Sequence, residues 1–550
     1  MTPGKAVAHP TTTHHLPLHQ ALYSFLAGTA TTEEKIKAVQ TALEGPVGQF
    51  WRRELGNWAA RMVPVELLVP EAHREWRPLV REAILFVVFK LSAPRLAPKI
   101  VQQAALDPAM PAEVRLLRFI AKVPALQKIG QALARNHNLH PRLRRALIKL
   151  ENGISDVSPE EICSIIACKL QPQIETYSIE LEPAILSEAS VSAVVGFTWL
   201  NPATYKRERG VFKVLKPYVA NCYAEDMRIL GLLARHLARK LHVAGTRLSR
   251  LAETLTEIRL LLEREVDFPR EQATLAKSLS EYRSLHGVRV PRVISPLSTA
   301  TITALTFERG KKVTNTRVVP AKLRLSVADR LARALLAVPV LSREKNPVFH
   351  ADPHAGNLLY DKRTNELVIL DWALTERLTR VQRKNVLLLV LMTILRDREG
   401  MARAIEDLCD LRTEHQAQPR NIHRQIDRLL DALPLTHLPG PMDAMLLLDR
   451  IALEGIRFPA ALLMFRKASL TLEGVVQDVA GSNVRLDSLM ANHTLANWKD
   501  VVACLLSLLS PRDWLALDWS ALTFTSRVCT KTLLQPWHWL VAGSANADAA

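Results

Sequence analysis

The sequence predicts a predominantly helical α+β protein built from two or three structural units. Its 550 residues exceed the size of one ordinary hydrophobic core. Glycine occurs only 20 times, whereas leucine, alanine and arginine are abundant, and this bias favours helices over a β-sandwich or a propeller. Hydrophobic residues make up 48% of the chain and charged residues 23%, which is the balance of a folded protein.

The net charge of +18 directs attention to anionic partners: nucleic acid, phosphate ligands or an acidic membrane surface. The basic stretches 142–149 and 235–250 lack interleaved aromatic residues, so nucleic acid is not expected. The N-terminus lacks the apolar segment of a signal peptide. The longest apolar run, 386–395, is shorter than the roughly 20 residues that cross a membrane. We therefore expect a cytoplasmic protein that is not secreted, has no transmembrane helix and contacts membranes only peripherally.

Composition changes along the chain in a way that predicts its elements. Ser158, Pro159 and Glu161 form a strong helix start. Further on, β-branched runs alternate with long helical stretches. The expected strands are 211–215, 288–294 and 300–307, and the expected helices between them are 223–241 and 251–279. The predicted segments are a disordered tail (1–20), an N-terminal helical region (21–114), a helical extension (115–180), a mixed α+β lobe (181–310), a mainly helical lobe (311–480) and a C-terminal helical region (481–550).

The sharpest motif is VFHADPHAGN at 348–357, followed by Asp371 in the tripeptide D-W-A. Phosphoryl transfer from ATP requires a carboxylate near the acceptor and oxygen ligands that hold Mg²⁺ against the phosphates. Kinases supply these groups as H-R-D-x-x-x-x-N and then D-F-G. His350, Asp352 and Asn357 keep that spacing. The pattern therefore predicts Asp352 as the catalytic base, with Asn357 and Asp371 as metal ligands.

The segment between these two ligands predicts a β-hairpin. It reads LLYD-KRTNE-LVILD from 358 to 371, two short apolar runs around a polar turn. Because an antiparallel hairpin brings its ends together, Asn357 and Asp371 are expected to converge on one ion. Two alternatives stay open: a helix cap or Asx turn without catalytic meaning, and a metallohydrolase built from His350, Asp352 and His354.

Other kinase parts can be sought upstream of this motif. Lys213, within the apolar run V-F-K-V, is the candidate strand lysine that binds the α- and β-phosphates. Glu271, on a later predicted helix, is its candidate partner, and 302–308 suits a hinge strand beside adenine. No G-x-G-x-x-G precedes Lys213, and G-x-x-x-x-G-K-[ST] is absent, so the sequence supports neither an ordinary glycine-rich kinase loop nor a P-loop.

With these motifs the chain resembles the atypical kinase-like UbiB/AarF family, whose members are associated with ubiquinone biosynthesis. The resemblance covers roughly residues 115–480. Its most specific elements are the pairing of HADPHAGN with an upstream K-x-G-Q, at 128–131, and an E-x-D signature, at 265–267. The stretch FRKASLTLEGVV at 465–476 also resembles the family's basic helix ending in L-E-G.

The resemblance implies a bilobal protein-kinase-like fold with an N-terminal helical extension that carries K-x-G-Q and a large helical C-terminal lobe. It implies ATP and Mg²⁺ (or Mn²⁺) as cofactors, with Asp352 as the base and Asn357 and Asp371 as metal ligands. Lys213 would hold the phosphates and pair with Glu271. The remaining nucleotide-site residues implied by the family are Ser190, Lys128, Gln131, Glu265 and Asp267.

The chain also departs from the family pattern. The family's alanine-rich loop A-A-A-S-x-x-Q-V corresponds here to 187–194, SEASVSAV, in which Glu188 would place an anion near the phosphates. D-F-G has become Asp371-Trp372-Ala373, which changes the aromatic packing and removes the backbone freedom of glycine. Ala355 also replaces the proline of HADPHPGN.

The sequence thus predicts a divergent UbiB-type ATP-binding kinase or ATPase linked to isoprenoid-quinone or membrane-lipid metabolism. Its expected partners are ATP or ADP, an anionic lipid surface and quinone-biosynthesis proteins. One alternative is a small-molecule phosphotransferase of the aminoglycoside or choline kinase type. Another is a pseudokinase that binds a nucleotide or lipid and serves as an assembly scaffold.

Overall fold

The computed structural model describes residues 28–526 apart from short gaps. The gaps are 63–64, 70, 72–73, 75–76, 108, 135–140, 152–155, 245–248, 284, 317–319, 343, 345, 410–418, 435–437 and 455. The predicted tail 1–20 and the last part of the predicted C-terminal region, 527–550, lie outside the described residues. The predicted fold class, predominantly helical α+β, is confirmed by the described elements.

The chain forms two compact units whose boundaries differ from the predicted segments. The first unit comprises Met1–Val266 and Pro296–Ala304, and the second comprises Asp267–Ser295 and Leu305–Ala550. The first unit therefore combines the predicted N-terminal region, the extension and most of the mixed lobe. The physical reason is a hydrophobic core that most helices of this unit share.

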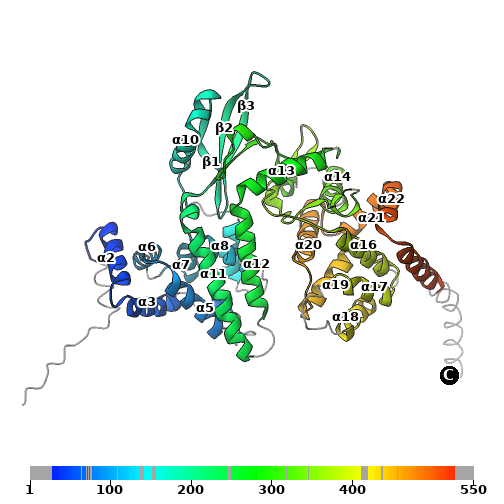
Figure 1. Cartoon of the computed structure of the whole chain (residues 1–550), viewed down its shortest axis with the longest axis horizontal. Coiled ribbons are helices and arrows are strands. Elements are labelled where there is room, and N and C mark those ends of the chain that lie inside the picture. Colours follow the sequence, from blue (N-terminus) through cyan, green and yellow to red (C-terminus); the bar gives the residue numbers. More distant parts are fainter. Residues whose placement is uncertain are drawn as a thin grey trace, which may run out of the picture. The chain divides into compact units, whose positions relative to one another are not determined.

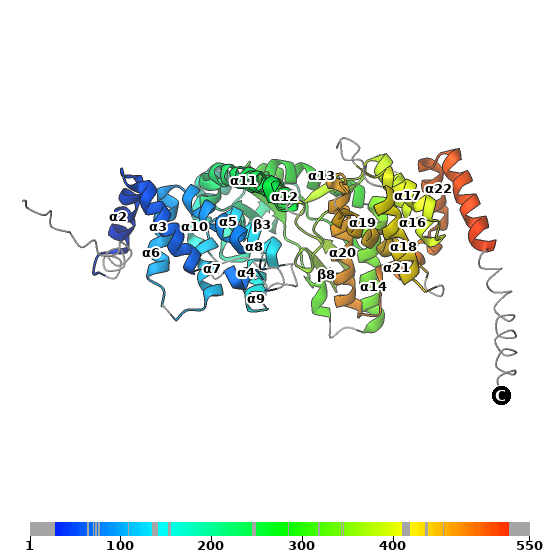
Figure 2. The same cartoon turned by 90° about the horizontal axis from the view of Figure 1, so that it is seen from below.

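Most helices of the first unit share one apolar core. Buried side chains include Leu96 and Ile100 of α6, Leu143 of α9, Leu230 of α11 and Leu262 of α12. Figures 1 and 2 show α11 and α12 side by side, with α5 and α8 close to them. The helices are α2 (Thr32–Glu44), α3 (Gly48–Met62), α4 (Val65–Leu68), α5 (Arg77–Lys90), α6 (Ala93–Ala104), α7 (Ala112–Ile120), α8 (Pro124–Ala134), α9 (Pro141–Glu151), α10 (Pro159–Thr176), α11 (Pro217–Ala244) and α12 (Ser249–Val266).

The sheet of the first unit has the order β1-β2-β3-β5. Its strands are β1 (Glu180–Glu188), β2 (Ser192–Asn201), β3 (Lys206–Leu215) and β5 (Ile302–Thr306), the last of which crosses into the second unit. β2 and β3 pair antiparallel from Ser192 opposite Leu215 to Asn201 opposite Lys206. The sequence carries no strand signal for β1, because this edge strand contains Pro183 and no buried apolar residue.

The second unit holds two small sheets that frame the predicted catalytic loop. One has the order β4-β9-β8-β6 and the other pairs β7 with β10. The predicted hairpin is present as β8 and β9, with Leu358 opposite Ile369. The strands are β4 (Val288–Arg289), β6 (Lys311–Lys312), β7 (Val348–His350), β8 (Leu358–Asp361), β9 (Glu366–Ile369) and β10 (Thr375–Arg377).

Helices make up the rest of the second unit, and Figure 1 shows α16–α20 grouped together in yellow to orange. A π-helical turn, 333–337, joins α14 to α15. The helices are α13 (Phe268–Tyr282), α14 (Ala321–Ala332), α15 (Val338–Leu341), α16 (Arg380–Ile394), α17 (Arg398–Glu406), α18 (Pro419–Ala432), α19 (Pro441–Leu453), α20 (Ala460–Ala480), α21 (Leu486–Ala496), α22 (Trp498–Leu508) and a helix over 511–526.

Some of the predicted helix and strand bounds are confirmed and others are wrong. The helix start at Ser158 is confirmed, because its side chain accepts a hydrogen bond from the Glu161 N–H at 3.1 Å. The continuous helix over 251–279 is wrong: Asp267 caps a new helix and separates α12 from α13. The strand over 288–294 is shorter than predicted, because Pro291 has no N–H and interrupts it. Within the described residues, no helix is both long and apolar enough to cross a membrane.

Candidate functional site

The predicted catalytic loop is held at both ends by main-chain hydrogen bonds. At its start β7 pairs with β10, and the Ala351 N–H donates to the Leu374 carbonyl at 2.9 Å. At its end the Leu370 N–H donates to the Asn357 carbonyl at 2.8 Å, continuing the β8–β9 ladder. Residues 351–357 and 370–374 are therefore two short segments clamped against each other.

The His350 side chain contacts the main chain of both segments. Its Nε2 lies 3.0 Å from the Leu370 carbonyl, and its Nδ1 accepts from the Asp352 N–H at 3.3 Å. These contacts require the neutral ring with the proton on Nε2. Burial agrees, since it lowers the pKa of the His350 imidazole below its ordinary value. Both ring nitrogens face main-chain groups and are not available to a metal, so the metallohydrolase alternative loses a ligand.

Trp372, which replaces the phenylalanine of D-F-G, is fully buried. Its ring meets His350 and Tyr282 edge to face, with centroids 5.4 Å apart in both cases. Its indole N–H donates to the Ile369 carbonyl at 3.0 Å. The indole ring is therefore buried with its N–H bonded. It packs between His350 and Tyr282, the last residue of α13.

Asp352, Asn357 and Asp371 present oxygen atoms at the surface of the second unit. Asp371 is exposed, and it adopts a left-handed backbone conformation with φ of 52°. The Asn357 amide donates from Nδ2 to the Asp352 carbonyl at 3.2 Å, which orients its Oδ1 as the acceptor. The Asp371 carboxylate accepts from the Ala373 N–H at 3.4 Å. Carboxylate and amide oxygens are the ligands that Mg²⁺ prefers, so this donor set fits the implied ion.

Glu271 and Asp267 lie at the start of α13 and belong to the second unit. Asp267 is the N-cap, and its Oδ1 accepts from the Arg270 N–H at 3.1 Å. Its carboxylate therefore has a structural task in addition to the predicted nucleotide-site role. Glu271, one turn into the helix, is buried with 2% of its surface exposed.

The first unit holds Lys213, Lys128, Gln131, Ser190 and Glu265. Lys213 lies on β3 opposite Val194 and is buried. Lys128 of α8 forms an ion pair with Glu265 at the end of α12, and both side chains are more than four-fifths buried. The Ser190 hydroxyl lies 3.4 Å from the other Glu265 oxygen. Gln131 is half-buried, one turn beyond Lys128 on α8.

The helix that carries K-x-G-Q is anchored by residues without a sequence signal. Asp226 of α11 accepts from the Ala125 N–H at the start of α8, at 3.0 Å. Arg95 of α6 pairs with the same carboxylate at 2.6 Å. Burial raises the pKa of Asp226, and the charge of Arg95 opposes that rise. A network of α6, α8 and α11 thus fixes the position of Lys128.

Glu188 has a cationic partner that the sequence does not indicate. The sequence places its anion near the phosphates, whereas the structure pairs its carboxylate with Lys216 at 2.7 Å. The pair is almost completely buried within the first unit. Glu188 is therefore paired with a lysine that belongs to none of the sequence motifs and that also pairs with Asp156.

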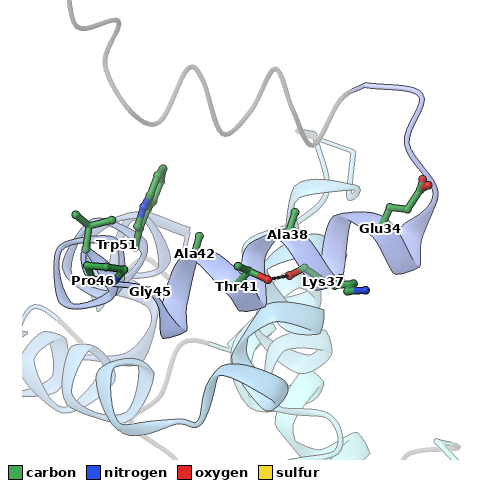
Figure 3. Close-up of a pocket in the computed structure, with 9 residues that line it drawn as sticks. Glu34, Lys37, Ala38, Thr41, Ala42, Gly45, Pro46 and Trp51 are labelled. Carbon is green, nitrogen blue, oxygen red and sulfur yellow. Dashed lines mark hydrogen bonds between the residues drawn. The ribbon is translucent and has the colours of Figure 1, made fainter.

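A shallow groove of about 720 Å³ lies elsewhere in the first unit, between α2 and the start of α3. Figure 3 shows Trp51 at one end of it and Glu34 at the other, with the Thr41 hydroxyl bonded to the Lys37 carbonyl. None of the predicted site residues lines this groove.

Comparison with known proteins gives one matching family. The family model for the ABC1 atypical kinase-like domain matches residues 149–405. The match includes Lys213, Glu271 and the catalytic loop, whereas K-x-G-Q at 128–131 precedes it.

Individual relatives agree with that match. The chain is 26% identical over 360 residues to "Protein ACTIVITY OF BC1 COMPLEX KINASE 7, chloroplastic" of Arabidopsis thaliana, covering 64% of this chain and 50% of that protein. It is 26% identical over 297 residues to "Probable protein kinase UbiB" of Xylella fastidiosa (strain M23), covering 52% of this chain and 50% of that protein. The matches thus span about half the length of these curated relatives.

A solved structure, "The complex structure of Rv3197-erythromycin from Mycobacterium tuberculosis", covers 72% of this chain and 97% of that chain, at 14% identity and a TM-score of 0.42. The residues matched by the family model include the motifs at 265–267 and 350–357. Residues 149–405 therefore match the ABC1 atypical kinase-like domain, and the chain is similar to relatives that include proteins named UbiB.

Proposed function

We propose that this protein binds ATP or ADP together with Mg²⁺ or Mn²⁺ and acts as an ATP-dependent phosphotransferase or ATPase. The observation that carries the proposal is the double clamp around residues 351–357 and 370–374, which holds the two segments that contain Asp352, Asn357 and Asp371 against each other. A loop held by its own main chain is already organised before a ligand arrives, as positioning catalysis requires.

Each residue has a proposed role. Asn357 and Asp371 hold the metal ion, which when bound neutralises charge on the phosphates. Asp352 accepts the proton of the acceptor hydroxyl or water. Neutral His350 keeps Asp352 in place through the main chain and does not itself exchange protons. Lys213 binds the α- and β-phosphates and pairs with Glu271. The other proposed nucleotide-site residues are Ser190, Lys128, Gln131, Glu265 and Asp267.

The metabolic setting is also a proposal. The relatives named UbiB support a link to isoprenoid-quinone or membrane-lipid metabolism, with quinone-biosynthesis proteins as partners. The net charge of +18 favours a cytoplasmic protein that associates peripherally with anionic lipid. Liposome pelleting tests this association. We expect binding that requires anionic lipid and weakens with salt; binding indifferent to both would contradict the electrostatic mechanism.

One observation favours a second candidate, a nucleotide-binding pseudokinase. In the D-W-A tripeptide the Ala373 N–H donates to the Asp371 carboxylate, so one of the metal-ligand oxygens is engaged by its own backbone. Such a chain would bind nucleotide with metal but turn it over slowly. ATP turnover with and without anionic liposomes separates the two candidates.

The proposed function is tested by metal-dependent thermal stabilisation with ATP and ADP. We expect both nucleotides to raise the melting temperature only when Mg²⁺ or Mn²⁺ is present. Asp371→Asn should abolish that stabilisation, whereas Asp431→Asn, an exposed aspartate of α18 in the same unit, should keep it. Equal stabilisation of wild type and Asp371→Asn would refute the metal-ligand assignment.

A further inference from the structure

Lys216, directly after β3, is buried between two carboxylates. Its Nζ lies 2.8 Å from Oδ1 of Asp156 and 2.7 Å from Oε1 of Glu188. The exposed fractions of the three side chains are 1%, 5% and 7%. The Asp156 N–H also donates to the Glu188 carboxylate at 3.0 Å. Charges so far from water are stable only when paired, so these three side chains depend on one another.

The cluster joins three separate segments of the first unit. Asp156 precedes α10, Glu188 ends β1, and Lys216 links β3 to α11. Tyr218 supports the junction, because its hydroxyl donates to the second Asp156 oxygen at 2.9 Å. Lys216 is therefore the cation that ties the helical extension to the sheet.

The turn between β1 and β2 is held by Lys216 from both ends. Its side chain binds Glu188, which precedes the turn, and its main-chain N–H donates to the Val191 carbonyl at 2.9 Å. Ser190 lies between these two attachments. The Ser190 hydroxyl then reaches Glu265, the partner of Lys128. Lys216 thus holds both ends of the turn that adjoins the Lys128–Glu265 pair, and the Ala189 N–H closes the turn by donating to the Ser192 carbonyl at 2.8 Å.

We infer that Lys216 is a positioning residue that sets the conformation of the turn 189–191 and, through it, the affinity of the protein for the phosphates of ATP or ADP. The inference rests on the proposed nucleotide-binding function. Of the turn's main-chain N–H groups, that of Ala189 is bonded to the Ser192 carbonyl at 2.8 Å, and those of Ser190 and Val191 can bind phosphate only when they converge. Loss of Lys216 would release the turn and would also leave the Glu188 carboxylate uncompensated, and each change disfavours an anionic ligand.

The test combines hydrogen exchange of the nucleotide-free protein with calorimetric affinities for Mg²⁺–ATP and Mg²⁺–ADP. Lys216→Met should accelerate exchange in peptides covering 186–194 and weaken both nucleotides by about tenfold or more. Lys216→Arg retains the cation between both carboxylates and should restore slow exchange and affinity. If Lys216 only filled space, Lys216→Arg and Lys216→Met would behave alike in both measurements.

Glu188→Gln provides a second variant in case Lys216→Met does not fold. It leaves Lys216 paired with Asp156 at zero net charge, and it should loosen the turn and weaken nucleotide binding several-fold. Glu182→Gln is the matched control, because Glu182 is also a β1 glutamate, but its partner Arg209 lies at the surface. This control should change neither exchange nor affinity.

The outcomes separate the inference from the proposed function. If wild type binds no nucleotide while Lys216→Met still accelerates exchange at 186–194, the proposed function fails and the control of the turn by Lys216 stands. If wild type binds nucleotide and the Lys216 and Glu188 variants bind it equally well, the positioning role is overturned. Tighter binding by Glu188→Gln would also overturn it, because Glu188 would then act by charge on the phosphates.

Discussion

The predicted site residues of the two units are held by different kinds of contact. In the second unit, main-chain hydrogen bonds fix the catalytic loop, and the bracing pair His350–Leu370 is 20 residues apart in sequence. In the first unit, buried ion pairs do this work, and Lys128 and Glu265 are 137 residues apart. A loop held by its backbone tolerates changes in surface charge. A turn held by buried charges depends on each of them, so the two regions should respond differently to substitution.

The largest expected effect is on the backbone-held loop. His350→Phe keeps an aromatic ring against Trp372 but leaves the Leu370 carbonyl and the Asp352 N–H without their partner. We expect the free energy of unfolding to fall by about 2–4 kcal/mol in urea titrations. His354→Phe is the control, since His354 is half-buried and accepts only from the Gly356 N–H. Equal losses in the two variants would show that His350 does not brace the loop.

The next effect concerns the charge-held region. Lys128→Ala leaves Glu265 mostly buried without its cation, so stability should fall by about 1–3 kcal/mol. Nucleotide affinity or preference should also change, and autophosphorylation should become detectable if Lys128 blocks protein-kinase activity. Lys169→Ala, an exposed lysine of α10, is the control. A Lys128→Ala protein with unaltered melting, affinity and autophosphorylation would show that Lys128 contributes neither to stability nor to the nucleotide site.

A pH titration sharpens the same comparison. Burial lowers the pKa of Lys99 in the first unit to about 8. Between that value and the ordinary one of about 10.4, the unfolded chain binds a proton that the folded chain has lost. Stability should therefore rise with pH in this window, by up to about 1.4 kcal/mol per pH unit. The measurement is urea unfolding of wild type and Lys99→Met at about pH 7.5, 8.5 and 9.5, values that bracket the lowered pKa. We expect the difference in unfolding free energy between the two proteins to change with pH. A difference that stays constant would argue against a titrating Lys99.

The smallest expected effect is on an exposed ion pair. Arg209 and Glu182 are bonded at 2.6 Å, but their side chains are 42% and 30% exposed. Water screens such a pair, so Arg209→Met should change the unfolding free energy by less than about 0.5 kcal/mol. A loss as large as that of Lys128→Ala would mean that burial is not what separates the two classes of pair.

The sequence indicates the catalytic loop because its contacts are local. Asn357 and Asp371 flank one hairpin, and the hairpin can be predicted from two short apolar runs around a polar turn. The approach of the two residues follows from that hairpin alone. The helix start at Ser158 is predictable for the same reason, since a cap reaches only three residues ahead.

The rest could not be predicted because its partners are distant in sequence and follow no period. Asp226 caps α8 across 101 residues, and Lys216 meets Asp156 across 60. In the sequence alone, Asp226, Lys216 and Asp156 look like ordinary surface residues. The same reason explains why Glu188 seemed an intruding anion: its charge is visible in the sequence, but the lysine that balances it is not.

The shared core of the first unit has a consequence for where the family domain can be cut. The family match begins at residue 149, within α9, whereas Leu96, Ile100 and Val101 of α6 pack in the same core as Leu230 of α11. A fragment expressed from the similarity boundary onward would lack the apolar cover of α11. Such a fragment should aggregate even though every recognisable kinase motif except K-x-G-Q is present. We therefore expect the segment that matches the family model to differ from the segment that can fold alone.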